Sequence, residues 1–271
     1  MTTKKVIHTT SGMELLRRLA EDGKRIITLD DARSYSAAAG ISQSYLRQAF
    51  HYLEQGGWVR RLRPGLYAIS PPLINAPIHE FEVAMYLVKD AAISHWSAMS
   101  YHALTDQIPR TVFVLTSDAV AAKQRGSPSE PYQVWGIRYV FVQVKPDRFF
   151  GTQQEWFGES RVLITDLERT LLDGLTRPAY CGGFAEVATA FESSIDRIDI
   201  DKIIAYALKL DVATVRRLGW MLEKSGIDST KLEPLLKSSH GEGYRPLDPT
   251  RPTGGPCNSH WGIRENLQQL V

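Results

Sequence analysis

Residues 40–69, GISQSYLRQAFHYLEQGGWVRRLRPGLYAI, decide the fold, because a two-faced helix is followed directly by a basic hairpin. We expect the helix over 42–55, ended by Gly56-Gly57. At 3.6 residues per turn its apolar side chains fall within roughly 100° of one another, a face that must be buried. These side chains are Leu46, Ala49, Phe50 and Leu53.

The opposite face of this helix is polar. It carries Ser44, Arg47, Gln48, His51 and Gln55, with Tyr45 and Tyr52 on a flank. In a DNA major groove, Arg can donate to guanine and Gln can pair with adenine. Ser42, the expected N-cap, leaves backbone N–H groups where a phosphate could bind. Any solvated helix face is also polar, so the helix alone leaves DNA binding and simple solvation open.

The neighbouring segments favour DNA binding. Helices are expected over 12–23 and 28–40, with Thr28 as an N-cap, before this one. Two strands, WVRRL and LYAIS, follow it and carry Arg60, Arg61 and Arg63. Three helices and a hairpin in this order predict a winged helix-turn-helix, with its recognition helix in the major groove and its wing on the backbone or minor groove. A winged helix that binds only protein is the alternative.

Two further expectations concern the hairpin. Pro64-Gly65 is the pair that a type II turn prefers, and type II turns suit two-residue hairpin loops poorly, so we expect a slightly longer loop. Residues 45–69 hold four Arg and one Glu. Binding to a polyanion should therefore depend strongly on salt.

The charge of the chain is unevenly distributed. Its formal net charge is +2 over 271 residues. Residues 1–70 hold 11 Lys and Arg against 6 Asp and Glu, a net of +5, and the remainder holds 21 against 24, a net of −3. A basic first quarter on a mildly acidic remainder favours a polyanion-binding module attached to a second domain.

The composition also indicates the cellular setting. The hydrophobic fraction of 43% and the charged fraction of 23% are typical of a globular protein with a core. Cys181 and Cys257 form no C-x-x-C pair, which argues against a disulfide framework and a zinc site. No apolar run approaches the ~20 residues of a membrane span, and MTTKKVIHTT lacks the apolar core of a secretory signal. We expect a cytoplasmic protein.

A proline-rich linker, SPPLINAPIHE, divides the chain into expected domains 1–72 and 73–271. In the second domain TVFVLTS, IRYVFVQV and SRVLITD predict strands, whereas FAEVATAF, IDKIIAYALKL and VATVRRLGWMLEKSG predict helices. Residues 238–256 should form an irregular loop, and SHWGIREN should return to the sheet as a last strand. The fold class is therefore α+β: a winged helix-turn-helix domain followed by a mixed α/β domain.

The second domain offers little catalytic chemistry. His95 and His102 lack a nearby Cys or carboxylate that would complete a metal site, and no nucleophile elbow surrounds Ser97 or Ser100. Asp166, Glu168 and Asp173 could serve a nuclease. Helix capping is the plainer role, with Thr165 and Glu168 as a capping box. We expect no catalytic residue, no metal and no cofactor.

The ordered set of motifs resembles the AbiEi antitoxins of bacterial abortive-infection operons, part of type IV toxin–antitoxin systems. The similarity runs through LRQAFHYLEQGGWVRRLRPGLYAIS, ISHWSAMSYHALTDQIPRTVFVLTS, VLITDLERTLLDGLTRPAYCGGFAEVATAF, RRLGWMLEKSG and HWGIREN. The Gly- and Pro-rich loop before CNSHWGIREN has no counterpart in this resemblance.

The resemblance implies a regulator that is not an enzyme. Family members repress their own operon by binding inverted repeats through the winged helix, and their second domain counteracts a nucleotidyltransferase-type toxin, with or without direct contact. Carried over to this chain, the DNA contacts fall on Ser42, Ser44, Tyr45, Arg47, Gln48, Arg60, Arg61 and Arg63, and His51 shares their helix face.

Two matters stay open at the level of sequence. Arg216, Arg217 and Lys224, expected to be exposed on their helix, are candidates for the antitoxin surface, although a solvated face would look the same. The alternatives to an antitoxin are a regulator whose second domain senses a ligand or partner, and a nuclease directed to DNA by the winged helix.

Overall fold

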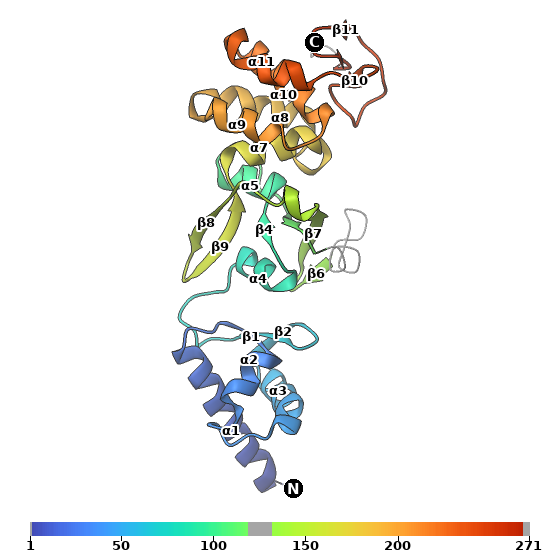
Figure 1. Ribbon diagram of the computed structural model, residues 1–271. Helices are drawn as coiled ribbons and strands as arrows, with labels where there is room; N and C mark the ends of the chain where they lie inside the picture. Colours follow the sequence, from blue (N-terminus) through green and yellow to red (C-terminus); the bar gives the residue numbers. More distant parts are fainter. Residues whose placement is uncertain (1, 119–131, 268–271) are drawn as a thin grey trace. The chain divides into compact units, whose positions relative to one another are not determined.

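The computed structural model describes residues 2–118 and 132–267 of the chain (Figure 1). Its backbone contacts divide it into two compact units. The first unit comprises Met1–Leu87, Gln133–Gly136 and Trp156–Ser160, and the second comprises Val88–Tyr132, Ile137–Glu155 and Arg161–Val271. The predicted α+β class is confirmed. The boundary after residue 72 stays a prediction about where separately folding domains meet.

The first unit has the elements of a winged helix-turn-helix. Three helices are followed by a hairpin, and a short strand pairs with it to give an antiparallel sheet of order β1-β3-β2. The elements are α1 (Thr2–Glu21), β1 (Ile26–Thr28), α2 (Leu29–Ser36), the 3-10 turn η1 (Gln43–Tyr45), α3 (Leu46–Gln55), β2 (Val59–Arg63), β3 (Leu66–Ile69) and α4 (Glu80–Leu87). The periodicity did not predict strand β1.

The core of this unit forms where α1, α3 and the sheet meet. The predicted apolar face of α3 is buried, because Leu46, Ala49, Phe50 and Leu53 are each at most 2% exposed. Leucines of α1 pack against this face in the same cluster. Phe50 stacks on Tyr67 of β3, with ring centroids 4.6 Å apart. The helix is thereby fixed to the sheet through one side only, and its polar side faces away from the core.

The end of α3 is set by its two glycines. Trp58 N–H donates to the carbonyl of Leu53 at 2.9 Å, and Gly57 N–H donates to that of Glu54 at 3.0 Å. These are the two hydrogen bonds of a Schellman motif, and Gly57 has the left-handed φ of +75° that the motif requires. The chain therefore leaves the helix in one fixed direction and enters β2.

The prediction that the hairpin loop has more than two residues is wrong. Strand β2 ends at Arg63 and β3 begins at Leu66, so only Pro64 and Gly65 connect them. The strand register shifts between Arg61 and Arg63. This bulge adds local twist, which lets a two-residue loop join strands that it would otherwise splay.

Replacement of Gly57 by Ala should destabilise the first unit by about 1–2 kcal/mol, because a residue with a Cβ is strained at positive φ. The midpoint of urea unfolding, followed by circular dichroism, measures the effect. Gly254→Ala is the matched control, since Gly254 has no left-handed φ and a Cβ there meets nothing within 4 Å. Equal midpoints for Gly57→Ala and the wild type would contradict the account of the turn.

The larger sheet is six-stranded and mixed, of order β6-β7-β5-β4-β9-β8, and most of its residues belong to the second unit. Strands β5 and β7 are parallel, β4 and β9 are parallel, and β4 runs antiparallel to β5. The strands are β4 (Ala92–Ile93), β5 (Thr111–Thr116), β6 (Tyr132–Val134), β7 (Ile137–Gln143), β8 (Thr152–Phe157) and β9 (Ser160–Thr165). The three strands predicted from β-branched runs are confirmed as β5, β7 and β9.

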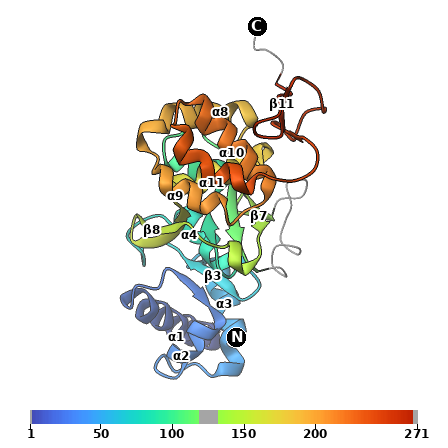
Figure 2. The same cartoon turned by 45° about the horizontal axis from the view of Figure 1, so that its top comes forward.

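Helices make up most of the rest of this unit, and α9, α10 and α11 pack against one another (Figure 2). Their buried side chains join those of α7 and α8 in the largest apolar cluster among the described residues. The helices are α5 (His95–Tyr101), α7 (Leu167–Thr176), α8 (Phe184–Ser194), α9 (Ile200–Ala207), α10 (Val212–Lys224) and α11 (Ser229–Ser238), with short 3-10 turns at Pro146–Arg148, Pro178–Tyr180 and Ile195–Arg197.

Two local predictions for this unit are wrong. The last strand does not return to the main sheet: β12 (Ile263–Arg264) pairs with β10 (Arg245–Pro246) and β11 (Cys257–Asn258) in a separate small sheet. Helix α7 is capped by Asp166, whose side chain accepts from Arg169 N–H at 2.9 Å, and not by Thr165. Glu168 is instead occupied with Asp199 and Lys202.

Candidate nucleic-acid interface

The polar face of α3 is open to solvent. Arg47, Gln48 and His51 are exposed, as are Ser42 and Ser44 just before the helix, and Tyr45 is half-buried. The two serines and Tyr45 lie in or beside the 3-10 turn Gln43–Tyr45, so the α-helix itself begins later than predicted, at Leu46. The predicted residues thus lie together, on the helix face opposite the buried one and at its N-terminal end.

Hydrogen bonds order part of this face. Gln48 Nε2 donates to Tyr52 Oη at 3.3 Å, and the Nε2 atoms of Gln55 and His51 lie 3.1 Å apart. The hydroxyls of Ser42 and Ser44 lie 3.2 Å apart, and Ser42 makes no side-chain cap to the turn that follows it. Amides held in this way lose less freedom when they bind a partner.

The charges of the first unit are distributed selectively. Carboxylates pair with four basic side chains on or beside α1 and α2: Arg17 with Glu14 and Glu21, Arg18 with Glu14, Lys24 with Asp31, and Arg33 with Asp30. Within the ranges 2–118 and 132–267, by contrast, no carboxylate lies within the 4.0 Å of an ion pair from Arg47, Arg60 or Arg61. Among these arginines and Lys24, the charges without a carboxylate partner in these ranges therefore lie on α3 and the hairpin.

The hairpin arginines have different surroundings. Arg60 and Arg61 are consecutive and both exposed, whereas Arg63 is half-buried and its Nη2 donates weakly to the carbonyl of Tyr86 at 3.5 Å. In the same unit the Arg60 guanidinium lies 4.2 Å from the ring centroid of Trp135. Of the three, Arg61 has the most accessible charge for a polyanion.

Tyr67 connects the two parts of the interface. Burial is the largest cause that raises the pKa of its phenol, and the positive charges of Arg61 and Arg47 oppose this rise while Glu54 adds to it. An arginine of the hairpin and an arginine of α3 thus act on the same hydroxyl. Tyr67 also stacks on Phe50, a contact between β3 and α3 that the sequence patterns did not predict.

The three carboxylates considered for a nuclease site, Asp166, Glu168 and Asp173, make structural contacts instead. Asp166 accepts from Tyr206 Oη at 3.1 Å besides capping α7, and Lys202 Nζ lies 3.2 Å from Asp166 and 2.7 Å from Glu168. Asp173 pairs with Arg169 at 2.9 Å. Among the described residues no group of three or more His, Cys, Asp or Glu is arranged to hold a metal ion.

The histidine and serine candidates also have structural contacts. His102 ends α5, and its Nε2 lies 2.7 Å from the carbonyl of Thr165. Ser97 Oγ donates to the carbonyl of Thr111 and accepts from the N–H of Phe113. Both side chains therefore tie α5 to its neighbours in the sheet.

Arg216 and Arg217 are buried, at 3% and 5% exposure, so the prediction that they are exposed is wrong. Lys224 is exposed as predicted. Spacing along α10 could not reveal that the chain after α11 folds back over the polar side of the helix. Arg217 donates to the carbonyls of Leu175 and Pro246.

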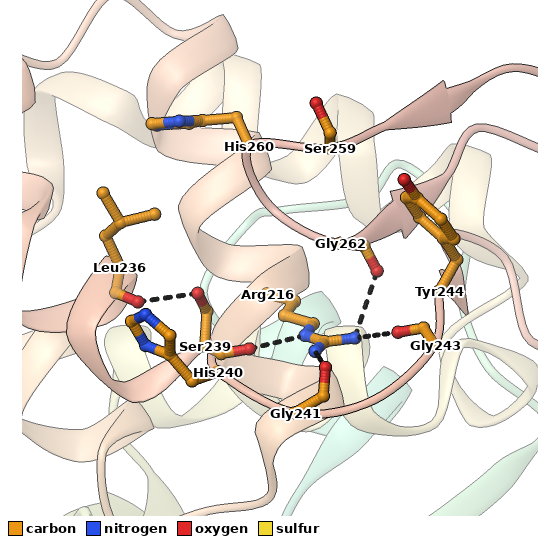
Figure 3. Close-up of a pocket in the computed structure, with 10 residues that line it drawn as sticks. All are labelled: Arg216, Leu236, Ser239, His240, Gly241, Gly243, Tyr244, Ser259, His260 and Gly262. Carbon is orange, nitrogen blue, oxygen red and sulfur yellow. Dashed lines mark hydrogen bonds between the residues drawn. The ribbon is translucent and has the colours of Figure 1, made fainter.

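Arg216 lines a cavity of about 380 Å³. Its guanidinium lies within a ring of carbonyls (Figure 3). It donates to Ser239 at 2.8 Å, Gly241 at 2.8 Å, Gly243 at 2.7 Å and Gly262 at 3.2 Å. Arg216 therefore holds residues 239–243 and Gly262 against α10. Most of its N–H donors are used in these bonds and are not available to a ligand.

Residues 14–70 match the family model AbiEi_4, described as "Transcriptional regulator, AbiEi antitoxin". This segment is an AbiEi-type regulator domain. The match contains α2, α3 and all three strands of the winged helix, and with them every predicted DNA-contacting residue. The description names a transcriptional regulator and no enzymatic activity.

The whole chain is similar to a solved structure, the RV2827C protein from Mycobacterium tuberculosis. The TM-score is 0.65 at 15% sequence identity, over 94% of this chain and 90% of that chain. At such low identity the similarity establishes the fold alone. No curated protein matches the sequence. Within the described residues, every helix is too short or too polar to cross a membrane.

Removal of the Asp166 side chain, which caps α7, should lower the stability of the fold and should not affect an enzymatic activity. We expect Asp166→Ala to destabilise the fold by about 0.5–2 kcal/mol, since it leaves an N-terminal N–H without its acceptor. Thermal unfolding measures this, with the exposed Asp201→Ala as a control. A Mg²⁺-dependent nuclease activity that Asp166→Ala and Glu168→Ala abolish at unchanged melting temperature would establish the enzyme alternative instead.

Proposed function

We propose that this protein is a DNA-binding antitoxin of a type IV toxin–antitoxin system. Its winged helix represses its own operon, and its second domain counteracts a nucleotidyltransferase-type toxin. Repression of a bacterial promoter places the protein in the cytoplasm, and a toxin that aborts infection makes phage defence its biological role. The proposal includes neither an enzymatic activity nor a cofactor.

The DNA-binding part of the proposal rests on which arginines of the first unit pair with a carboxylate. Carboxylates neutralise Arg17, Arg18 and Arg33 on α1 and α2, whereas Arg47 on α3 and Arg61 on the hairpin are exposed and have no such partner among the described residues. A duplex presents base edges in its major groove and phosphates on either side. We propose as DNA-contacting residues Ser42, Ser44, Tyr45, Arg47, Gln48, His51, Arg60, Arg61 and Arg63.

Within this set, α3 should read bases and the hairpin should bind the backbone. We expect Arg47→Ala and Gln48→Ala to lose about 1–3 kcal/mol of discrimination between the operator and unrelated DNA for each good base contact. Arg61→Ala should weaken binding to all sequences and lower the salt slope by about one. Fluorescence anisotropy with the gene's own upstream DNA at several salt concentrations measures both effects.

Arg17→Ala provides the control for net charge. Arg17 is exposed on α1 but already paired with Glu14 and Glu21, so its loss should change neither affinity nor the salt slope appreciably. Wild-type binding in Arg47→Ala, Gln48→Ala and Arg61→Ala together would refute the assignment of the interface.

The antitoxin part rests on the AbiEi match of residues 14–70 and on the ordered motifs of the second domain. It requires a neighbouring gene for a nucleotidyltransferase-like toxin. We expect expression of that gene alone to arrest growth and co-expression of this chain to restore it. The winged-helix variant Arg61→Ala should still restore growth, because neutralisation is assigned to the second domain.

The closest competing function is a regulator whose second domain senses a ligand. Growth arrest that this chain fails to relieve, together with intact operator binding, would favour that alternative.

A further inference from the structure

A cavity of about 190 Å³ lies within the second unit, at the carboxyl ends of the parallel strands β5 and β7. Leu115 lines it near the end of β5, and Gln143 and Lys145 line it at the end of β7 and just beyond. In open α/β sheets this edge is where ligands bind, because the chain leaves the strands there and side chains converge. Nothing in the proposed function uses this cavity.

The remaining walls come from helices and loops. Helix α7 and the residue after it contribute Arg169, Asp173, Thr176 and Arg177, while Arg148 follows β7. His95 also lines the cavity. It is buried at 2% exposure with a left-handed φ of +50°, and its Nδ1 lies 2.9 Å from Ser94 Oγ. Strained backbone of this kind persists where the surroundings hold a side chain in place.

The lining is electropositive. It contains the cations Lys145, Arg148, Arg169 and Arg177 but only two carboxylates, Asp173 and Asp211. Both oxygens of Asp211 accept from Thr214, and Arg169 pairs with Asp173. In the part of the chain that the structure describes, no carboxylate lies within the 4.0 Å of an ion pair from Lys145, Arg148 or Arg177. Burial lowers the pKa of His95 to about 4, so this ring adds no charge at neutral pH.

Asp173 lacks one hydrogen bond. Its Oδ1 accepts from Arg169 Nε at 2.9 Å, whereas its Oδ2 is buried and has no partner among the described residues. A buried carboxylate oxygen without a donor is costly, and such atoms in folded proteins call for a specific explanation. The cavity thus presents several cations for an anion, and the Asp173 side chain in its wall has one acceptor without a donor, which is closed off from solvent in this conformation.

We propose that this cavity binds phosphate in a form that retains a proton. Arg148, Arg177 and Lys145 hold the unprotonated oxygens. When phosphate binds, a rotation of the Asp173 carboxylate brings Oδ2 to the cavity, where it accepts from the P–OH group. Hydrogen bonds from an O–H to a carboxylate are among the strong ones. A site of this design rejects sulfate, which has the same shape but no proton at neutral pH and would face Asp173 with a second acceptor.

The first test is isothermal titration of the full chain at pH 7 and constant ionic strength, with inorganic phosphate and with sulfate. We expect phosphate to bind at least about tenfold more tightly than sulfate, because the unmatched acceptor penalises the latter. Methyl phosphate at pH 5.5, where the monoester retains a proton, distinguishes the sources: binding equal to that of phosphate identifies a phosphorylated small molecule as the ligand, and weaker binding identifies free phosphate.

Variants separate the two halves of the site. Asp173→Asn replaces the acceptor by an amide that can also donate, so the preference for phosphate over sulfate should fall to about equal affinity. Since this change also removes the partner of Arg169, Arg177→Ala is the second variant. Arg177 is exposed, and its loss should weaken phosphate and sulfate binding alike by about fivefold or more, the scale of one charge-assisted hydrogen bond.

Lys231→Ala, an exposed change on α11 outside the cavity, should leave both affinities unchanged. The proposal is overturned if the wild-type chain, folded by circular dichroism, binds no phosphate at millimolar concentration. It is also overturned if phosphate and sulfate bind equally and Arg177→Ala has no effect. Because every lining residue belongs to the second unit, neither result bears on the DNA-binding proposal.

Discussion

The stack of Phe50 on Tyr67 is the contact on which the proposed interface depends. It joins the buried side of α3 to β3, the central strand of the small sheet, and β3 in turn pairs with the arginine-bearing β2. Such a stack contributes about 0.5–1.5 kcal/mol beyond the burial of its rings. Its larger consequence is geometric, because it fixes which side of α3 faces outward relative to Arg61.

Two backbone features then complete this geometry. The Schellman motif at Gly57 sets the direction in which the chain enters β2, and the bulge between Arg61 and Arg63 allows a loop of only two residues. Arg60 and Arg61 precede the bulge in β2, and both are exposed. Arg47, Arg60 and Arg61 on α3 and the hairpin have no carboxylate partner among the described residues, while carboxylates neutralise Arg17, Arg18 and Arg33 on α1 and α2.

Local signals in the sequence predicted much of this. The spacing of Leu46, Ala49, Phe50 and Leu53, the glycine pair and the arginine-rich strand each act within a few residues, so pattern alone identified the winged helix and the exposed face of α3. Predictions that depend on distant chain segments failed. Arg216 is buried because carbonyls up to 46 positions away surround it, and the final strand pairs with β10 and β11 rather than the main sheet. Likewise, the cavity beside Asp173 exists only once β7, α7 and the segment after α9 come together.

The central claim, that α3 reads bases in a major groove, is tested most directly by methylation interference on the gene's own upstream DNA. Arginine contacts guanine at O6 and N7, and methylation of N7 blocks this contact. The account predicts that methylated guanines at symmetric positions of an inverted repeat abolish wild-type binding, and that Arg47→Ala loses this sensitivity. Binding that is indifferent to guanine methylation would contradict major-groove recognition by α3.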